Sequence, residues 1–238
     1  MNFIKLAAVA AVTAGTFAVA HANTLTQTGT VPVQKTDFSE QFFTVPTTTT
    51  FNAFSTAFGT LSSVVVTING TAQDSGSLTN SSASTQTFKF STNSSTFSGT
   101  TSNAPAPLVA FLNGAGSLNY ASAVNTYTLA AGGTAAFPIT GTNGFTNSPL
   151  SATVTFTASS DLAAFSGANY GANLTTLTGQ SFTGGGGNVN SVLTTSEGAN
   201  LVITYNFSPP VIGVPEPMSL ALLGAGLAGI GIIRRRRA

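Results

Sequence analysis

The sequence predicts an all-β fold, an antiparallel β-sandwich or jelly-roll-like domain, with a targeting segment at either end. Short runs rich in β-branched and aromatic residues alternate with clusters of Gly, Asn, Ser and Pro. Some runs alternate strictly, so that Val154 and Phe156 share one strand face and Thr153, Thr155 and Thr157 share the other. Between the two ends, no charged amphipathic helix pattern is present. These observations together favour a sandwich.

The predicted strands follow in order along the chain, at residues 41–45, 63–68, 85–91, 107–112, 125–129, 135–140, 150–157 and 200–207. Asn-Gly is a strong signal for a tight turn, and it occurs at positions 69–70, 113–114 and 143–144. Residues 93–107 and the glycine-rich residues 181–190 are predicted to be longer loops. Pro209 and Pro210 predict an extended linker over residues 209–213.

Charge is scarce and segregated. The chain has 238 residues, of which 5% are charged, and its formal net charge is +1. Most of the positive charge lies in Arg234, Arg235, Arg236 and Arg237 near the C-terminus, so residues 23–214 carry a net charge of −3. A body without a basic surface is a poor partner for nucleic acid. Its polarity comes from hydroxyls, because 62 of these 192 residues are Ser or Thr.

The residue types needed for most catalytic and metal sites are missing. The chain has no cysteine, and its one histidine, His21, lies in the N-terminal segment. The body therefore lacks the groups for Ser-His-Asp or Cys-His catalysis and for zinc, copper or haem sites built on those ligands. Asp74-Ser75-Gly76 resembles an aspartic-protease triplet, but no second copy occurs, so a polar turn is the simpler interpretation. We expect a noncatalytic protein without metal or cofactor.

Five carboxylates leave one enzymatic alternative open. Asp37 and Glu40 are close in sequence and could act as a hydrolase pair if the fold set them at a suitable separation. Calcium could also be bound by carboxylates and carbonyls, although no D-x-D loop is present.

The N-terminal segment has the three parts of a secretory signal peptide. Lys5 supplies positive charge, residues 6–19 are apolar or small, and Ala20 and Ala22 flank His21 in a small-x-small cleavage pattern. We expect residues 1–22 to be a signal peptide and the mature domain to start at Asn23.

The C-terminal segment predicts a membrane helix. Val214, Pro215, Glu216 and Pro217 precede an apolar run over residues 218–233, which the arginine cluster 234–237 follows. Sixteen helical residues span about 24 Å, somewhat less than the ~30 Å hydrocarbon core of a bilayer. The arginines would stay on the cytoplasmic side and leave the body outside.

This arrangement resembles the PEP-CTERM sorting signal of Gram-negative bacteria over residues 214–238. The resemblance implies that an exosortase, a membrane-embedded cysteine peptidase, recognises Val214–Pro217 and removes the tail. It further implies passage across the inner membrane, transient anchoring there, and a final place at the cell surface or in an extracellular matrix of exopolysaccharide or biofilm. A permanent anchor is the plainer alternative.

The body carries a second resemblance. Residues 54–68, 161–167, 187–189 and 201–207 resemble the choice-of-anchor E domain, a bacterial surface domain, and the similarity would cover residues 24–208. We therefore expect one β-sandwich domain over residues 23–208. The leading interpretation is a structural matrix protein. The alternative is a carbohydrate-binding or adhesive module that uses its tyrosines, at positions 120, 127, 170 and 205, or its threonine-rich strands.

Overall fold

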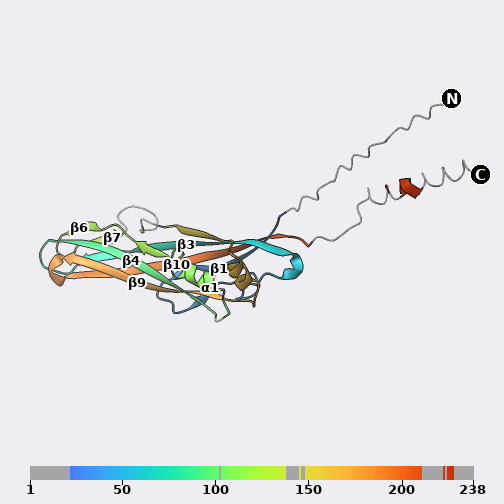
Figure 1. The fold of residues 1–238 in the computed structure, drawn as a ribbon. Coiled ribbons are helices and arrows are strands. Elements are labelled where there is room, and N and C mark those ends of the chain that lie inside the picture. Colours follow the sequence, from blue (N-terminus) through green and yellow to red (C-terminus); the bar gives the residue numbers. More distant parts are fainter. Residues whose placement is uncertain are drawn as a thin grey trace, which may run out of the picture.

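The protein is a long sandwich of two antiparallel sheets in the computed structural model, which describes residues 22–101, 103–137, 145, 148–210, 222 and 224–227 (Figure 1). The antiparallel sandwich prediction is thereby confirmed. Sheet A runs in the order β1 (Asn23–Lys35), β10 (Val189–Ser208), β3 (Thr60–Asn80) and β7 (Thr134–Phe137), and β8 (Leu150–Phe156) also pairs with β3. Sheet B runs in the order β2 (Gln41–Phe42), β9 (Ala172–Gly184), β4 (Gln86–Thr100) and β5 (Asn119–Ala121), and β6 (Asn125–Leu129) also pairs with β4.

Two strands of unusual length set the shape. β3 has 21 residues and β10 has 20, and they pair along their whole length from Asn80 opposite Val189 to Thr60 opposite Ser208. Twenty extended residues cover roughly 65 Å. Asn23 at the start of β1 lies opposite Phe207 near the end of β10. Both described ends of the body are thus at one end of the sandwich, while the β3–β4 and β9–β10 connections are at the far end (Figure 1).

The space between the sheets holds two hydrophobic clusters. The larger one includes Phe54, Ile68, Leu201 and Tyr205, and the smaller one, nearer the far end, consists of Leu78, Phe88, Phe90, Tyr127 and Phe137. Between them the inward positions of β3, β4 and β10 are polar. We call this set the buried polar layer; it comprises Asp74, Thr92, Ser94, Thr195 and Glu197.

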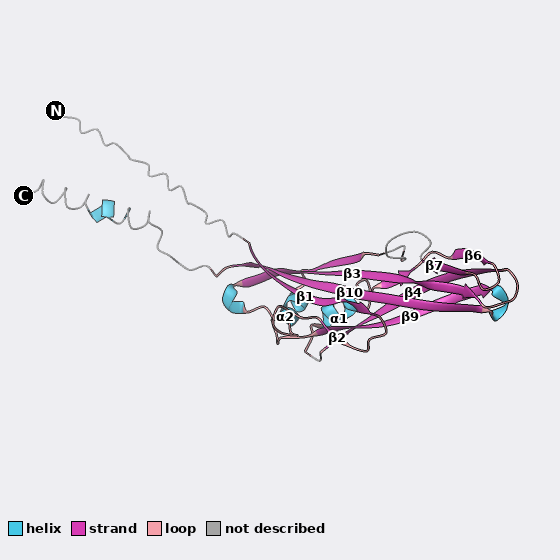
Figure 2. Ribbon diagram, turned by 180° about the vertical axis from the view of Figure 1, so that it is seen from behind, coloured by secondary structure: helices cyan, strands magenta, loops and turns pink. Residues whose placement is uncertain are grey.

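Short helices cover the tail-proximal half, as Figure 2 shows. They are α1 (Ala106–Leu112), α2 (Ser159–Phe165) and the 3-10 turn η1 (Thr56–Phe58); a further 3-10 turn, η2 (Gly185–Gly187), joins β9 to β10. The predicted strand at 107–112 is wrong, because this segment forms α1. Pro107 falls in the first turn, where a missing N–H costs nothing, and Leu108, Phe111 and Leu112 are buried together.

The predicted turn at Asn69-Gly70 is also wrong, since β3 continues through it. Asn69 lies opposite Asn200 and Gly70 lies opposite Ala199. A Cβ at Gly70 would lie 2.2 Å from the Tyr120 hydroxyl and 2.4 Å from a Leu118 methyl. The glycine is therefore explained by close packing within a strand.

The remaining strand predictions differ mainly in their ends. Residues 125–129 match β6, and residues 150–157 match β8 to within one residue. The predicted strand 85–91 begins one residue before the longer β4, and 200–207 falls inside the longer β10. The predicted loops 93–107 and 181–190 are partly wrong, because β4 continues to Thr100 and β9 to Gly184. The 113–114 turn is confirmed, whereas 143–144 and the end of the predicted strand 135–140 lie outside the described residues. The long strands β1 and β9 were not predicted.

Candidate functional site

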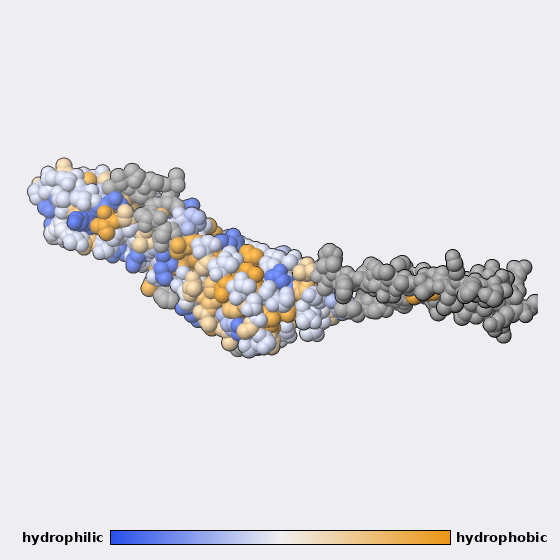
Figure 3. All heavy atoms as spheres, turned by 45° about the horizontal axis from the view of Figure 1, so that its top comes forward, coloured by the Kyte–Doolittle hydropathy of each residue, from blue (hydrophilic) through white to orange (hydrophobic). Residues whose placement is uncertain are grey.

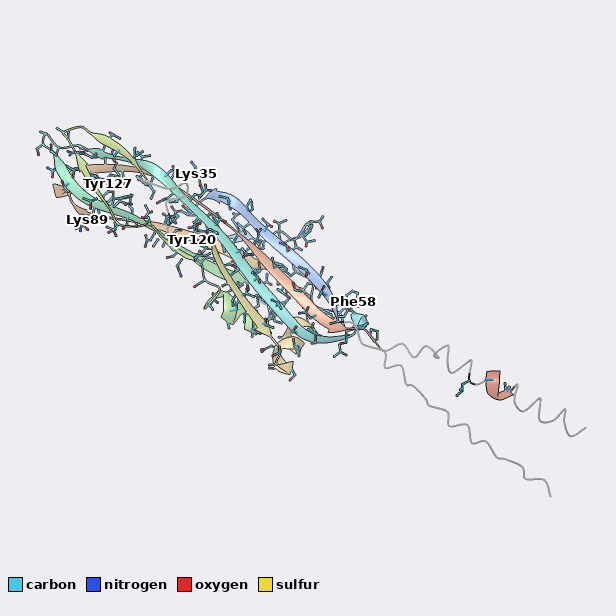
Figure 4. All side chains as sticks on the ribbon, turned by 90° about the horizontal axis from the view of Figure 1, so that it is seen from above. Lys35, Phe58, Lys89, Tyr120 and Tyr127 are labelled. Carbon is cyan, nitrogen blue, oxygen red and sulfur yellow. The ribbon has the colours of Figure 1, made fainter. Side chains whose placement is uncertain are left out.

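The chain leaves the body through a fixed corner. Ser208 ends β10, and the exposed Pro209 and Pro210 follow it. Gly59, at φ 130°, closes the η1 turn against this exit, and a Cβ there would lie 1.9 Å from the Ser208 carbonyl oxygen. Figure 4 shows Phe58 at this same end of the sandwich. The last strand of the body is thus held in place where the C-terminal segment begins.

The sorting and orientation residues themselves lie beyond this corner. Val214–Pro217, Arg234–Arg237 and Ala20 are outside the described residues, so their predicted roles are untested by the geometry. Of the predicted helix 218–233, Leu222 and residues 224–227 are described and are helical. Within the described part of the chain, no helix has the length and apolar character needed to cross a membrane.

The carboxylates proposed as a hydrolase pair tie the β1–β2 connection to β9. The Asp37 N–H donates to Thr176 Oγ1 at 2.9 Å, and Asp37 Oδ1 accepts from the Thr178 N–H at 2.8 Å. The Glu40 carboxylate accepts from Asn173 Nδ2. Both acidic residues therefore have a structural role, which is to hold the β1–β2 connection against β9. Among the described residues, no group of three or more His, Cys, Asp or Glu side chains could hold a metal ion.

Asp74 and Glu197 were not expected to be interior residues, yet both are almost fully buried in the polar layer, at 3% and 1% exposure. The expected polar turn at Asp74-Ser75-Gly76 is wrong, because the triplet lies within β3. Asp74 Oδ2 accepts from the Thr92 hydroxyl of the opposite sheet, while Oδ1 has no hydrogen-bond partner in the described structure. Burial raises the pKa of Asp74, and the Thr92 bond opposes this shift.

The Glu197 carboxylate is buried without compensation by a hydrogen bond from the described part of the chain. Within the described residues, neither of its carboxylate oxygens has a partner in hydrogen-bond geometry. Burial raises its pKa from the ordinary 4.5 to about 7; the nearby Ser94 hydroxyl lowers it in part, and the Asp37 charge raises it further. The pKa of Tyr120 is also raised, by burial and by the charge of Glu197. The carboxyl group is therefore close to half protonated at neutral pH.

All four tyrosines are core residues, with exposures of 5% or less. The hydroxyls of Tyr170 and Tyr205 are hydrogen-bonded to each other at 2.9 Å, and the Tyr205 hydroxyl donates to the Asn52 carbonyl at 3.0 Å. Figure 4 shows Tyr120 midway along the body and Tyr127 nearer the far end. The suggestion that tyrosines form a sugar-stacking surface is wrong, because none of the rings is presented to solvent.

The threonine-rich strands do form a continuous surface. On the outer side of sheet A, β1, β10, β3 and β8 align their outward residues in rows across the strands. We call this the threonine face. Its rows are Thr30, Asn200, Asn69 and Ser151; Thr28, Val202, Thr67 and Thr153; Thr26, Thr204, Val65 and Thr155; and Thr24, Asn206 and Ser63.

Neighbouring side chains on the threonine face bond to one another along these rows. Thr67 and Thr153 hydroxyls lie 2.9 Å apart, and the Thr26 and Thr204 hydroxyls lie 3.1 Å apart. Thr30 Oγ1 donates to Asn200 Oδ1 at 2.8 Å. The face carries no charged residue. Over three strand spacings and four rows it measures roughly 15 by 20 Å.

Among the described residues, the surface has shallow hollows. One of about 230 Å³ next to α1 is lined by Thr96, Ser98, Leu112, Asn113, Ser117 and Asn119. Because it contains no titratable side chain, it offers no acid or base to a bound molecule. The visible face in Figure 3 is mostly pale, as expected for a body whose polarity comes from hydroxyls.

Comparison with known proteins identifies the end of the chain. Residues 213–237 match the model of the PEP-CTERM protein-sorting motif. Neither the curated proteins nor the solved structures contain a match to the chain, and no comparison confirms the choice-of-anchor E resemblance of the body.

The fold and the motif together define the class of protein. It is an exported β-sandwich protein that is anchored at the membrane before processing. More particularly, the chain carries a PEP-CTERM sorting signal and is thereby a substrate of an exosortase-type enzyme.

Proposed function

We propose that the protein is a noncatalytic structural component of an extracellular matrix, delivered to the outside of a Gram-negative cell by its C-terminal signal. The sorting motif at residues 213–237 carries this proposal, because it requires the body to be outside the inner membrane. Supporting it, four of the five body carboxylates have structural surroundings: Asp37 and Glu40 bond to β9, and Asp74 and Glu197 are buried between the sheets. Exopolysaccharide or biofilm is the proposed setting.

Processing of the tail provides the test. In cells with the exosortase, we expect the mature protein to lack its arginine cluster and to leave the membrane fraction. In cells without the exosortase, or with Glu216→Ala, we expect the intact tail to be retained. The matched control is Pro209→Ala, a change in the linker outside the motif, which should be processed normally. An intact tail in both strains, measured by mass spectrometry, would contradict the proposal.

A second candidate function is carbohydrate binding by the threonine face. The observation that favours it is the regular, uncharged array of hydroxyl and amide groups across four strands. Such a face matches the hydrogen-bonding groups of a neutral polysaccharide chain without aromatic stacking. Its hydroxyls already bond to one another, but each keeps further acceptor capacity.

The face can be tested by a single bulky charge. Thr153→Lys places a long charged side chain among the rows of the threonine face. Thr126→Lys, the control, places the same side chain on the exposed side of β6 in sheet B, away from that face. We expect retention on matrix polysaccharide to fall for the first variant and to be unchanged for the second. If the unmodified protein is not retained by any polymer of the matrix, this function is excluded.

A further inference from the structure

Two long strands extend beyond the strands that flank them. β9 pairs with β4 along its whole length, but with β2 only at Asn173 and Leu174. β10 pairs with β3 along its whole length, but with β1 only as far as Ser196, opposite Lys35. Residues 179–184 of β9 and 189–194 of β10 therefore have one edge without a partner strand in the described structure.

The backbone polar groups on these edges point outward. Thr176 and Thr178 direct their N–H groups away from β4, to the Phe38 carbonyl at 3.3 Å and the Asp37 carboxylate at 2.8 Å. The two-residue period of a strand then directs the N–H and C=O groups of Gln180 and Phe182 to the same open side. On β10, the Thr195 carbonyl accepts from the Thr36 N–H at 3.0 Å, so Ser191 and Leu193 are open by the same rule.

The two open edges lie along the same narrow side of the sandwich. Ser191 Oγ of β10 donates to Gln180 Oε1 of β9 at 2.9 Å, and the hydroxyls of Thr178 and Thr195 lie 3.1 Å apart. A hollow of about 160 Å³, lined by Lys35, Thr36, Asp37, Leu193, Thr194 and Thr195, marks the point where β1 ends and the free part of β10 begins. We call this side, from residues 179–184 and 189–194, the open seam.

The open seam lacks the features that normally protect a strand edge. Natural edges carry lysines, prolines or bulges that prevent pairing with another chain. Residues 179–184 and 189–194 contain no charged residue and no proline, and both pair with their inner neighbours in an unbroken register. Within these two segments, Val192 is 61% exposed and Phe182 is 38% exposed. An extended strand of another chain is the partner that satisfies such an edge.

We propose that the open seam is an interface between two copies of this chain, in which β9 of each copy pairs antiparallel with β10 of the other. β9 and β10 run in opposite directions because the short turn η2 joins them. A two-fold axis parallel to the strands therefore places β9 beside the partner's β10, and β10 beside the partner's β9, in the antiparallel sense. Sheets A and B each become continuous with a sheet of the second copy.

This arrangement agrees with anchoring, and in this respect it rests on the proposed function. An axis parallel to the strands leaves the exits after Ser208 of both copies at the same end, so two chains held in one membrane can form it. Pairing of β9 with the partner's β9 needs a perpendicular axis, which puts the two exits at opposite ends. The geometry thus favours β9–β10 pairing before the tail is removed.

Disulfide cross-linking of the full-length chain tests the interface, because the protein has no cysteine of its own. Ser181 and Val192 both point to the outer side of their sheets and are exposed, so they come to the same face of a shared sheet. Two differently tagged chains, one with Ser181→Cys and one with Val192→Cys, are produced together in cells without exosortase, and membranes are oxidised and run on nonreducing gels. We expect a mixed dimer several-fold more abundant than either homodimer.

The control places the cysteine elsewhere on the same sheet. Thr155→Cys lies at an exposed position on the outer side of β8 and should give only background cross-linking. Gln180→Pro removes an outward N–H together with the side-chain bond from Ser191, and it should reduce the mixed dimer. Gln180→Ala removes only the bond from Ser191 and should leave the mixed dimer unchanged. A dominant Ser181→Cys homodimer, or no product above the Thr155→Cys background, would overturn the proposal. Tail processing is scored separately in cells with exosortase, so loss of the dimer does not affect the sorting result.

Discussion

Replacing Glu197 by glutamine removes a buried carboxylate that has no hydrogen-bond partner in the described structure. In the wild-type protein the folded state holds this carboxyl with a pKa of about 7, against 4.5 in an ordinary environment. Between these two values the folded state binds more protons than the unfolded state, so the free energy of unfolding falls as pH rises. At 1.36 kcal/mol per pH unit, a difference of about 2.5 units corresponds to about 3 kcal/mol.

The direction of the pH dependence of stability follows from which state, folded or unfolded, holds the proton on Glu197. Below pH 4.5 the carboxyl is neutral in both states, and its burial carries no charge penalty. Above pH 7 it is charged in both states, and the folded protein is less stable by about 3 kcal/mol. Glu197→Gln cannot ionise, so it should match the wild type below pH 4.5 and exceed it by up to about 3 kcal/mol at pH 8. Burial also raises the pKa of Asp74, so this carboxyl adds a slope of the same sign.

Urea unfolding of residues 22–210 at several pH values measures this effect, because both hydrophobic clusters lie inside that segment. The matched control is Thr126→Val on the exposed side of β6, which removes no titratable group and should leave the slope unchanged. Stability that stays constant or rises between pH 5 and pH 8 would refute the reasoning. So would a Glu197→Gln protein that is no more stable than the wild type at pH 8.

Three further changes test the packing by the same measurement. Phe54→Ala should cost about 3–5 kcal/mol, because this ring is 2% exposed and contacts three other aromatic rings, whereas Phe58→Ala, at a half-exposed ring, should cost much less. Gly76→Ala should cost about 1–3 kcal/mol, because a Cβ would lie 1.8 Å from a carbonyl oxygen of β10, whereas Gly167→Ala meets nothing closer than 3.5 Å and should be neutral. Asn80→Ala should cost about 2–3 kcal/mol, since its buried amide donates to three turn carbonyls at 2.8, 2.9 and 3.0 Å.

The fold class could be predicted because hydrophobic alternation is local. Val64, Val66 and Ile68 stand at alternate positions of β3, and all three are fully buried. Strand lengths could not be predicted in the same way. The inward face of β4 changes from Phe88 and Phe90 to Thr92 and Ser94 without leaving the interior. Such a change looks like the end of a strand in sequence, because buried hydroxyls depend on partners from the opposite sheet.

The errors at Gly70 and α1 have different causes. Gly70 accommodates Tyr120 and Leu118, which approach from distant parts of the chain, so only the tertiary structure explains it. In α1 a local signal was present, since Leu108, Phe111 and Leu112 have the spacing of one helix face. β1 and β9 were missed because their outward residues are mostly Thr, Ser and Asn, which are also typical of loops.

Export and sorting were predicted from the ends of the chain, whereas the proposals on what the protein binds rest on the body. With Asp74 and Glu197 buried, the charged residues left on the body are Lys35, Asp37, Glu40, Lys89 and Asp161. Long-range electrostatic steering is therefore weak, and salt should change association of the body very little. Under the two proposals, contacts come from short-range groups, which are the hydroxyls of the threonine face for polysaccharide and the free backbone of the open seam for a second copy. Because the tail leaves the body at one end, two anchored copies can pair through the open seam while the threonine face of each stays free for polysaccharide.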